Sequence, residues 1–401
     1  MRILATADWH LRDKDIDEAE KCLNFLIETA RSENVDLIIN AGDTFDSQEI
    51  KLDSKAAKLA IRTVSELADI APVAIIIGTN SHDGKSPEIL QFAKGIFPVH
   101  VSAVPEQVYF VKDGNAFRES GEGYSPQAVI TLIPQPSKQF FQTESGIADG
   151  DQEIGTAMSG LFAGFGVQAE GFDCPHILAY HGCVSGGKSS NMQLMTGRDV
   201  EVSRDQIALS GACLILCGHL HLPQELPGSI FYSGSIYANN VGENHKHGFY
   251  VHDVDALGLT SRFIETPAKK LLRLQEDFTA DIGHMELDAV LYSYEREDLS
   301  GAYIRCDFTV WQDLAAEIDK EKIKAFFLSA GALDVDIRIV RVPRQNVRSE
   351  AVLKADSLRD KIQKMAELKG EEVEWSILAK ADSLEDMIAD ELIQTVSGGQ
   401  I

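Results

Sequence analysis

The first 78 residues alternate between short apolar segments and amphipathic ones, and no other feature constrains the fold as strongly. Segments 1–7, 35–41 and 73–77 are rich in aliphatic residues, whereas 17–32 and 54–69 carry apolar residues at helical spacing. This strand and helix alternation predicts parallel neighbouring strands with helices on the faces of the sheet. The chain is therefore predicted to be an α/β protein with its functional site at the carboxyl ends of the strands.

Candidate metal ligands follow several of the apolar segments. Asp8 and His10 come directly after the first strand and project from the same face of an extended backbone. The candidate set in chain order is Asp8, His10, Asp43, Asn80, His181, His219 and His221. Carboxylate, amide and imidazole ligands suit Mn²⁺, Fe²⁺ or Zn²⁺. Seven ligands fit two ions about 3.5–4 Å apart with one bridging carboxylate, and Asp43 is predicted to be the bridge.

Two further residues are predicted to be catalytic. His82 is a candidate general acid, or a donor to the charge that develops in the reaction, and Asp83 is expected to orient it. Asp46 is interpreted as a local cap or as a partner of a ligand. The other histidines, including the ligand-like pair His245 and His247, are interpreted as ordinary buried or exposed side chains.

The composition restricts the functional classes. A formal charge of −25 counts against a free-standing DNA-binding protein, because duplex DNA repels an acidic surface. It does not exclude an enzyme that meets phosphate through bound cations or a basic partner. The sequence shows no apolar run long enough to span a bilayer and no basic and apolar signal segment. The six cysteines are scattered without paired spacing, which favours reduced thiols and a cytoplasmic location.

The rest of the chain suggests three parts. Residues 1–266 are predicted to form the main domain with a second sheet, residues 267–343 a small α+β domain, and residues 344–401 a pair of amphipathic helices. These helices are expected either to pack on their own domain or to present a docking surface for helices of a partner. The strands expected after the first three are 129–133, 176–180, 214–216, 230–232, 249–251 and 259–264 in the main domain, with 271–274, 303–310 and 335–342 in the small one. A loose helix is expected within 142–175, and helices are expected over 285–294 and 313–328.

Short motifs give the chain a family resemblance over roughly residues 1–265. The motifs are Asp8-Trp9-His10, Gly42-Asp43-Thr44-Phe45-Asp46, His82-Asp83, His181-Gly182 and Gly218-His219-Leu220-His221. Together they resemble the signature of the calcineurin-like metallophosphoesterases. Within that superfamily the chain is most similar to SbcD-type DNA repair nucleases, through its Asp-Trp-His opening, its Gly-His-Leu-His-Leu-Pro run and Tyr232-Ser233-Gly234-Ser235.

The resemblance implies a four-layer α/β/β/α sandwich with two Mn²⁺ ions, a homodimer and a capping domain. It also implies that the C-terminal helices bind an SbcC-type SMC-like ATPase. By position, one ion would be held by Asp8, His10, Asp43 and His221. The other would be held by Asp43, an asparagine, His181 and His219.

One motif departs from the family pattern. The family reads Gly-Asn-His-Asp, whereas this chain reads Gly78-Thr79-Asn80-Ser81-His82-Asp83, which is two residues longer. Asn80 is expected to supply the amide ligand because of its chemistry, with Ser81 as the alternative that strict alignment favours.

The resulting functional hypothesis is a metal-dependent DNA nuclease subunit that acts with an SMC-like ATPase in end processing, repair or recombination. A phosphoesterase acting on a small phosphodiester or a phosphoprotein is the alternative, and the acidic composition favours it. A third hypothesis is a scaffold whose metal site no longer turns over. The sequence leaves open whether cutting is exonucleolytic or endonucleolytic.

Overall fold

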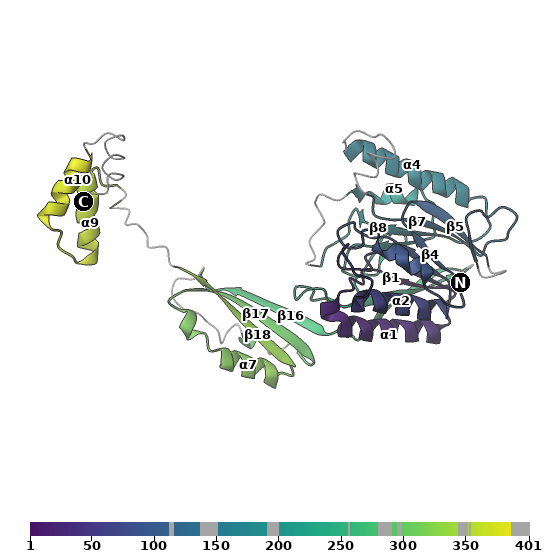
Figure 1. Ribbon diagram of the computed structural model, residues 1–401, viewed down its shortest axis with the longest axis horizontal. Coiled ribbons are helices and arrows are strands. Elements are labelled where there is room, and N and C mark those ends of the chain that lie inside the picture. The colour runs from purple at the N-terminus through teal and green to yellow at the C-terminus, as the bar shows by residue number, and fades with distance from the viewer. Residues whose placement is uncertain are drawn as a thin grey trace. The chain divides into compact units, whose positions relative to one another are not determined.

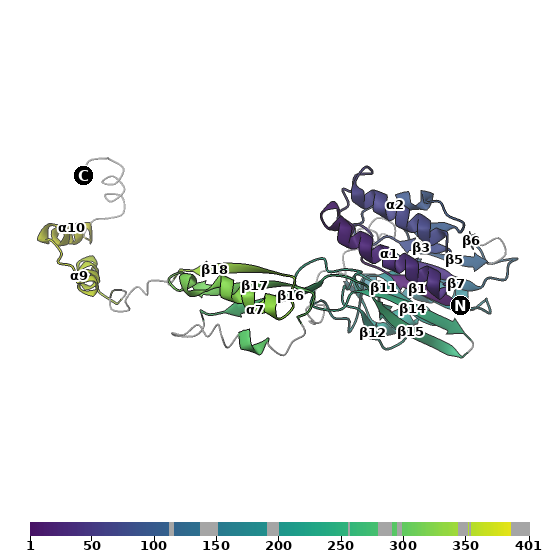
Figure 2. The same ribbon diagram turned by 90° about the horizontal axis from the view of Figure 1, so that it is seen from below.

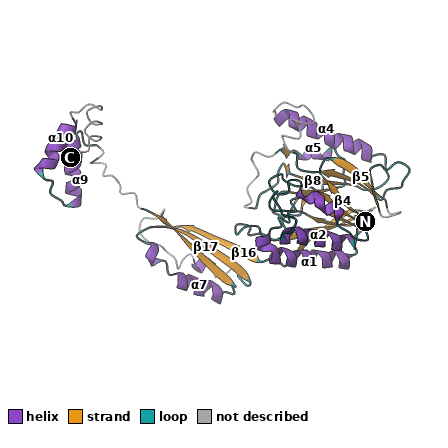
Figure 3. Ribbon diagram, viewed as in Figure 1, coloured by secondary structure: helices purple, strands orange, loops and turns teal. Residues whose placement is uncertain are grey.

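A computed structural model describes residues 1–111, 116–136, 151–190, 200–255, 257–279, 291–294, 299–343, 352 and 354–385. It contains two large sheets, one two-stranded sheet and one three-stranded sheet (Figures 1 and 3). Two compact units are distinguished, one made of residues 1–276, 286–308 and 319–338 and the other of residues 277–285, 309–318 and 339–401. Each unit is considered by itself.

The first large sheet has six strands in the order β15-β14-β1-β2-β3-β4. Its strands are β1 (Arg2–Thr6), β2 (Leu37–Asn40), β3 (Val73–Ile76), β4 (Val99–Ser102), β14 (Gly248–Asp255) and β15 (Gly258–Glu265). The neighbours β1, β2, β3 and β4 pair in parallel, with Thr6 opposite Asn40, while β14 pairs antiparallel with β1. The helices between the parallel strands are α1 (Ile16–Glu33) and α2 (Lys55–Ala68), with 3-10 turns η1 (Asp13–Asp15) and η2 (Ser86–Phe92). The predicted β-α-β-α-β unit is thus present.

The second large sheet has seven strands in the order β12-β13-β11-β8-β7-β5-β6. Its strands are β5 (Glu106–Val111), β6 (Ala116–Arg118), β7 (Ala128–Ile133), β8 (His176–His181), β11 (Leu214–Gly218), β12 (Gln224–Leu226) and β13 (Ile230–Tyr232). Its helices are α4 (Asp151–Ala169) and α5 (Arg204–Ala208), and β9 (Cys183–Val184) and β10 (Glu201–Val202) form the two-stranded sheet. The parallel pair of β8 and β11 places Gly218 opposite His181, so both strands end at the same edge.

Three apolar clusters show that the large sheets stack between outer helices. One cluster joins the inner faces of the sheets, for example Ile39 of β2 with Ile130 of β7 and Leu216 of β11. A second packs α1 and α2 on the outer face of the first sheet, and a third packs α4 and α5 on the second. Figure 1 shows α1 and α2 on one side of the strands and α4 and α5 on the other, and Figure 2 views the α1 and α2 layer from below. The predicted α/β/β/α sandwich is therefore confirmed.

The later residues form smaller elements. A three-stranded sheet joins β16 (Lys270–Asp277), β17 (Ala302–Trp311) and β18 (Asp334–Val342), and helix α7 (Lys320–Ser329) buries Ile323 and Phe327. The helix predicted over 313–328 is interrupted. A 3-10 turn, η3 (Ala315–Glu317), ends before Asp319 caps α7 through Lys322 N. Two C-terminal helices follow, α9 (Leu358–Lys369) and α10 (Trp375–Glu385). The predicted helix at 285–294 and the end of the last helix lie largely outside the described residues, and the boundaries of the three domains stay predictions.

Candidate metal centre

The candidate ligands lie where parallel strands of both large sheets end. Asp8 and His10 follow β1, Asp43 follows β2, His181 ends β8, and His219 with His221 follows β11. The loops are tied together by their backbones, since Asp8 N donates to Gly42 O at 2.9 Å and His10 N donates to Asp43 O at 3.0 Å. The Asp8 carboxylate in turn accepts a hydrogen bond from His219 N at 2.9 Å. The two sheets therefore share one polar edge.

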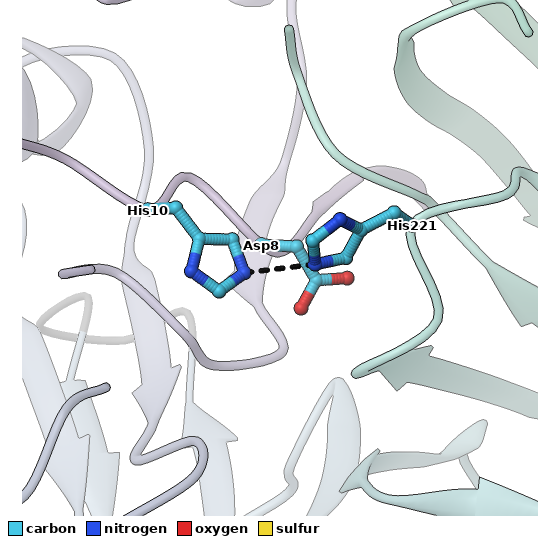
Figure 4. Close-up of side chains that lie close together, drawn as sticks. All are labelled: Asp8, His10 and His221. Carbon is cyan, nitrogen blue, oxygen red and sulfur yellow. Dashed lines mark hydrogen bonds between the residues drawn. The ribbon is translucent and has the colours of Figure 1, made fainter. Parts of the chain in front are cut away.

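Two groups of side chains that share no residue lie at this edge and are able to hold a cation, and a further group, His10, Asp46 and His82, overlaps the first at His10. Asp8, His10 and His221 form one, and Asp43, His181 and His219 form the other, with ligand atoms within 4.8 Å of one another in each. In the first group, His10 Nε2 and His221 Nε2 are 3.0 Å apart beside Asp8 (Figure 4). Residues separated by some two hundred positions in the chain are thus adjacent in space.

Asp43 faces both groups. Its Oδ2 atom lies 3.7 Å from His10 Nε2 and 3.4 Å from His181 Nε2. Its other oxygen, Oδ1, accepts hydrogen bonds from Thr79 N at 2.5 Å and from Thr79 Oγ1 at 2.9 Å. One carboxylate oxygen is therefore held by Thr79 while the other points between the histidines, which is the position that a bridging ligand requires.

The backbone at this edge is strained. Six non-glycine residues with positive φ occur in the described part of the chain, and four of them are candidate ligands: Asp8 at 52°, His10 at 43°, Asp43 at 52° and His219 at 97°. Non-glycine residues rarely adopt this conformation, and such strain tends to gather at functional sites. Close packing adds to it, because a Cβ at Gly78 would overlap the Asp43 carboxylate.

The donor atoms fit divalent cations. His181 Nδ1 donates to Ala41 O at 2.6 Å, so Nε2 is left to face Asp43, and this buried Nε2 has no hydrogen-bond partner. A histidine with one ring N–H held by a carbonyl or carboxylate, and with the other nitrogen left to bind, is the usual arrangement of a metal ligand. His221 repeats it, because its Nδ1 donates to Glu243 Oε1 at 2.8 Å while Nε2 faces His10.

The electrostatics of the centre also favour a cation. Burial lowers the pKa of His181, but Asp43 and Asp8 outweigh it and raise that pKa to about 9. Burial would raise the pKa of Asp43, yet His181 and His10 hold it well below its usual range. The pKa of Asp8 is raised, chiefly by burial. The negative charge that keeps a proton on His181 is charge that divalent ions would neutralise.

His82 and Asp83 take different positions from those expected of a hydrogen-bonded pair. The ring of His82 lies 4.6 Å from that of His10, between centroids, and its Nδ1 is 3.1 Å from Asp46 O. Asp83 is fully buried, and its oxygens accept hydrogen bonds from Phe45 N at 2.9 Å and Gly78 N at 2.8 Å. The orientation of His82 by Asp83 therefore stays a prediction that this placement does not favour. Asp83 instead ties the loop after β2 to the loop after β3, and the Asp46 carbonyl orients His82.

The Gly78–Asp83 motif, which is two residues longer than the family's, brings a threonine to the candidate metal centre. Asn80 and Ser81 are both exposed, whereas the buried Thr79 contacts Asp43. The assignment of Asn80 as a ligand stays a prediction that this placement does not favour, and the same holds for Ser81. In the family motif the asparagine directly follows the glycine, and in this chain Thr79 directly follows Gly78. That adjacency was the sequence signal that could have pointed to Thr79.

Other contributors could not be identified from the sequence. Glu243 is buried and holds His221. Arg12 Nη1 contacts Asp46 Oδ2 at 3.1 Å, and Asp46 Oδ1 lies 3.7 Å from His10 Nδ1. Asp46 thus lies beside a candidate ligand, and of the three residues it is the one already named from the sequence, as a local cap or as a partner of a ligand.

Comparison with known proteins places this geometry in a family. The family model described as Calcineurin-like phosphoesterase matches residues 1–225. A curated relative, the SbcD component of the nuclease SbcCD of Bacillus subtilis (strain 168), is 25% identical over 260 residues, which is 61% of this chain and 63% of the relative. The chain thus matches less than two thirds of that protein's length.

Two solved structures align with about two thirds of the chain. One is "GAP50 the anchor in the inner membrane complex of Plasmodium", 14% identical, with a TM-score of 0.42 over 67% of this chain and 85% of that one. The other is 10% identical, with a TM-score of 0.39 over 66% of this chain and 98% of that one. In addition, no helix among the described residues is both long and apolar enough to cross a membrane.

Proposed function

This chain belongs to the calcineurin-like phosphoesterase family, and from that premise we propose that it hydrolyses phosphodiester bonds of DNA as the nuclease subunit of a complex with an SMC-like ATPase. The observation that carries the proposal is the position of Asp43 between two groups of ligands, with His82 beside them. A hydrolase of this family uses divalent ions, and this site has the side chains to hold a pair. The distant likeness to a nuclease subunit supports DNA as the substrate.

In this proposal Asp8, His10, Asp43 and His221 hold one ion, and Asp43, His181 and His219 contribute to the other. When bound, two divalent ions, Mn²⁺ in our proposal, supply positive charge that offsets the phosphodiester charge and lowers the pKa of the attacking water. Asp43 keeps both groups in one geometry because Thr79 restricts the rotation of its carboxylate. Glu243 keeps Nδ1 of His221 protonated, so that Nε2 remains a ligand atom.

His82 has the role of general acid. The Asp46 carbonyl accepts from Nδ1, which leaves Nε2 to pass a proton to the leaving oxygen. Arg12 supports this arrangement because it holds the Asp46 side chain. Asp83 positions the two loops but does not touch the reacting atoms, and it is a positioning residue in this account.

The C-terminal helices are the proposed ATPase-binding element. They line a cavity of about 350 Å³ with Leu358, Ile362, Met365, Val373 and Ile377. Met365 is 48% exposed and Trp375 is 76% exposed, so helices α9 and α10 carry apolar surface of the kind that helices of a partner cover. A basic partner would also offset the formal charge of −25 when DNA is bound. We further propose a homodimer and a cytoplasmic location, the latter supported by six free cysteines.

The test is cleavage by the purified chain with Mn²⁺, alone and with its co-expressed ATPase, on linear and circular duplex DNA. Asp43→Asn and His82→Ala are expected to abolish cleavage. Undiminished nuclease activity in either variant would refute the proposal. Product lengths from end-labelled DNA would separate exonucleolytic from endonucleolytic cutting.

A small phosphodiester or a phosphoprotein is the second candidate substrate, favoured by the acidic composition. A panel that compares DNA with a nitrophenyl phosphodiester and a phosphopeptide separates the two. Hydrolysis of the small substrates with no cleavage of DNA, even with the ATPase, would select the second candidate. Absence of all turnover, with the partner still bound, would select an inactive scaffold.

A further inference from the structure

A separate group of possible ligands lies outside the metal centre already described. Glu243, His245 and His247 alternate along the segment between β13 and β14, and each offers one ligand atom within 4.8 Å of the others. Glu243 is 1% exposed and His247 is 5% exposed, while His245 is partly buried.

The two imidazoles are held in orientations that leave one nitrogen of each unused. His245 Nε2 lies 2.9 Å from the His221 carbonyl, which only accepts, so Nε2 carries the hydrogen and Nδ1 carries the lone pair. His247 Nδ1 is 3.0 Å from Ser235 Oγ, and with Nδ1 donating to this hydroxyl the lone pair of the ring lies on Nε2. Both remaining nitrogens, His245 Nδ1 and His247 Nε2, are buried without a hydrogen-bond partner. A ring held at one nitrogen by a protein group and free at the other is the pattern of a metal-bound histidine.

Glu243 adds the anionic ligand. Its Oε1 accepts from His221 Nδ1 and from Asn240 Nδ2, both at 2.8 Å, and its Oε2 accepts from Asn239 N at 2.9 Å. A carboxylate has about four lone-pair sites, so one remains after these three hydrogen bonds. Two buried imidazole lone pairs beside a buried carboxylate repel one another unless something positive lies between them.

We propose that Glu243, His245 and His247 form a third, accessory site for one Zn²⁺-like divalent ion, separate from the pair centred on Asp43. Two imidazole nitrogens and one carboxylate oxygen, with an open position for water, match the donor set of zinc sites with three protein ligands. His245 and His247 also line a cavity of about 530 Å³ that gives an ion a route to the site. Because Glu243 also holds His221, the accessory ion would fix the segment that orients this ligand of the main centre. The inference does not depend on DNA being the substrate.

The first experiment counts ions in the full-length protein. The protein is stripped with a chelator, equilibrated with Zn²⁺ and freed of excess ion, and bound zinc is measured by elemental mass spectrometry. His245→Gln and His247→Gln are each expected to bind one ion fewer than the unmodified chain. His100→Gln is the matched control, because His100 pairs with Glu106 away from the group and its loss should leave the count unchanged.

The second experiment separates the accessory site from the main centre. In the Asp8→Asn, Asp43→Asn double variant one tightly bound Zn²⁺ should remain, and adding His245→Gln should remove it. Co²⁺ absorption in the visible range gives an independent record of the same ion, and circular dichroism of the stripped proteins shows that each variant is folded. A full ion count in both histidine variants, or no ion left in the double variant, would overturn the proposal. Neither result would bear on whether the main centre cleaves phosphodiesters.

Discussion

Replacing Thr79 by valine tests how the candidate bridging carboxylate is held. Valine keeps the shape of threonine but removes the Oγ1 donor, which lies 2.9 Å from Asp43 Oδ1. The backbone hydrogen bond from Thr79 N stays. A hydrogen bond to a charged group contributes about 1.5–3 kcal/mol, and each 1.4 kcal/mol or so corresponds to about a tenfold change in binding. We therefore expect Thr79→Val to weaken binding of the ion pair by about 10- to 100-fold, the range typical for partners of metal ligands.

The assay is competition of the stripped protein with a chromophoric chelator for Mn²⁺. Thr63→Val is the matched control, because Thr63 is also buried but its Oγ1 has no hydrogen-bond partner. That variant should bind ions as the unmodified chain does and should unfold at the same or a higher temperature. Equal Mn²⁺ affinity in Thr79→Val and Thr63→Val would refute the claim that Thr79 orients Asp43.

Three further predictions concern packing, acid stability and the C-terminal helices. Gly78→Ala should abolish ion binding and lower the free energy of unfolding by about 2 kcal/mol or more in a urea titration, because the new Cβ overlaps Asp43. Gly164→Ala is the control, because Gly164 is a helical position with open space around it. This variant should raise the free energy of unfolding by up to about 1 kcal/mol. Burial lowers the pKa of His252 to about 4, so the unfolded chain takes up a proton at this residue at a higher pH than the folded protein does. The free energy of unfolding should therefore fall by about 3 kcal/mol between pH 6.5 and pH 4. His252→Gln should remove that part of the dependence in urea titrations across this range, and an unchanged slope would contradict the assignment. Truncation after residue 345 should abolish co-purification of the ATPase and leave the ion count intact, whereas loss of ions would show that the helices support the centre.

The sequence predicted the layers of the fold well where its periodicity was strong. The segments that became β1, α1, β2, α2 and β3 alternate clearly, and parallel strands end at a common edge for topological reasons. After Pro98 the pattern weakens, and β5 and β6 escaped prediction. Helix α4 was expected only as a loose helix, because its glycine-rich, largely apolar sequence has no clear amphipathic face.

The grouping of most candidate ligands was predictable from the sequence, but the residues that hold these side chains in place were not. Asp8, Asp43 and the late histidines follow strands, so topology brings them together. Glu243 holds His221 from a loop 22 positions further along the chain, and no local pattern marks such a contact. The role of Asp83 also depended on tertiary structure, since a histidine and an aspartate adjacent in sequence suggest a pair, whereas Asp83 turns to backbone amides. The positive φ angles at four ligands likewise arise from the fold and not from any glycine at those positions.

Anomalous diffraction from crystals soaked in Mn²⁺ tests the central claim most directly. We expect two peaks about 3.5–4 Å apart on either side of the Asp43 carboxylate, one contacted by Asp8, His10 and His221 and the other by His181 and His219. The same map shows whether Thr79, Asn80 or Ser81 faces the second ion. A single peak, or peaks remote from Asp43, would contradict the account.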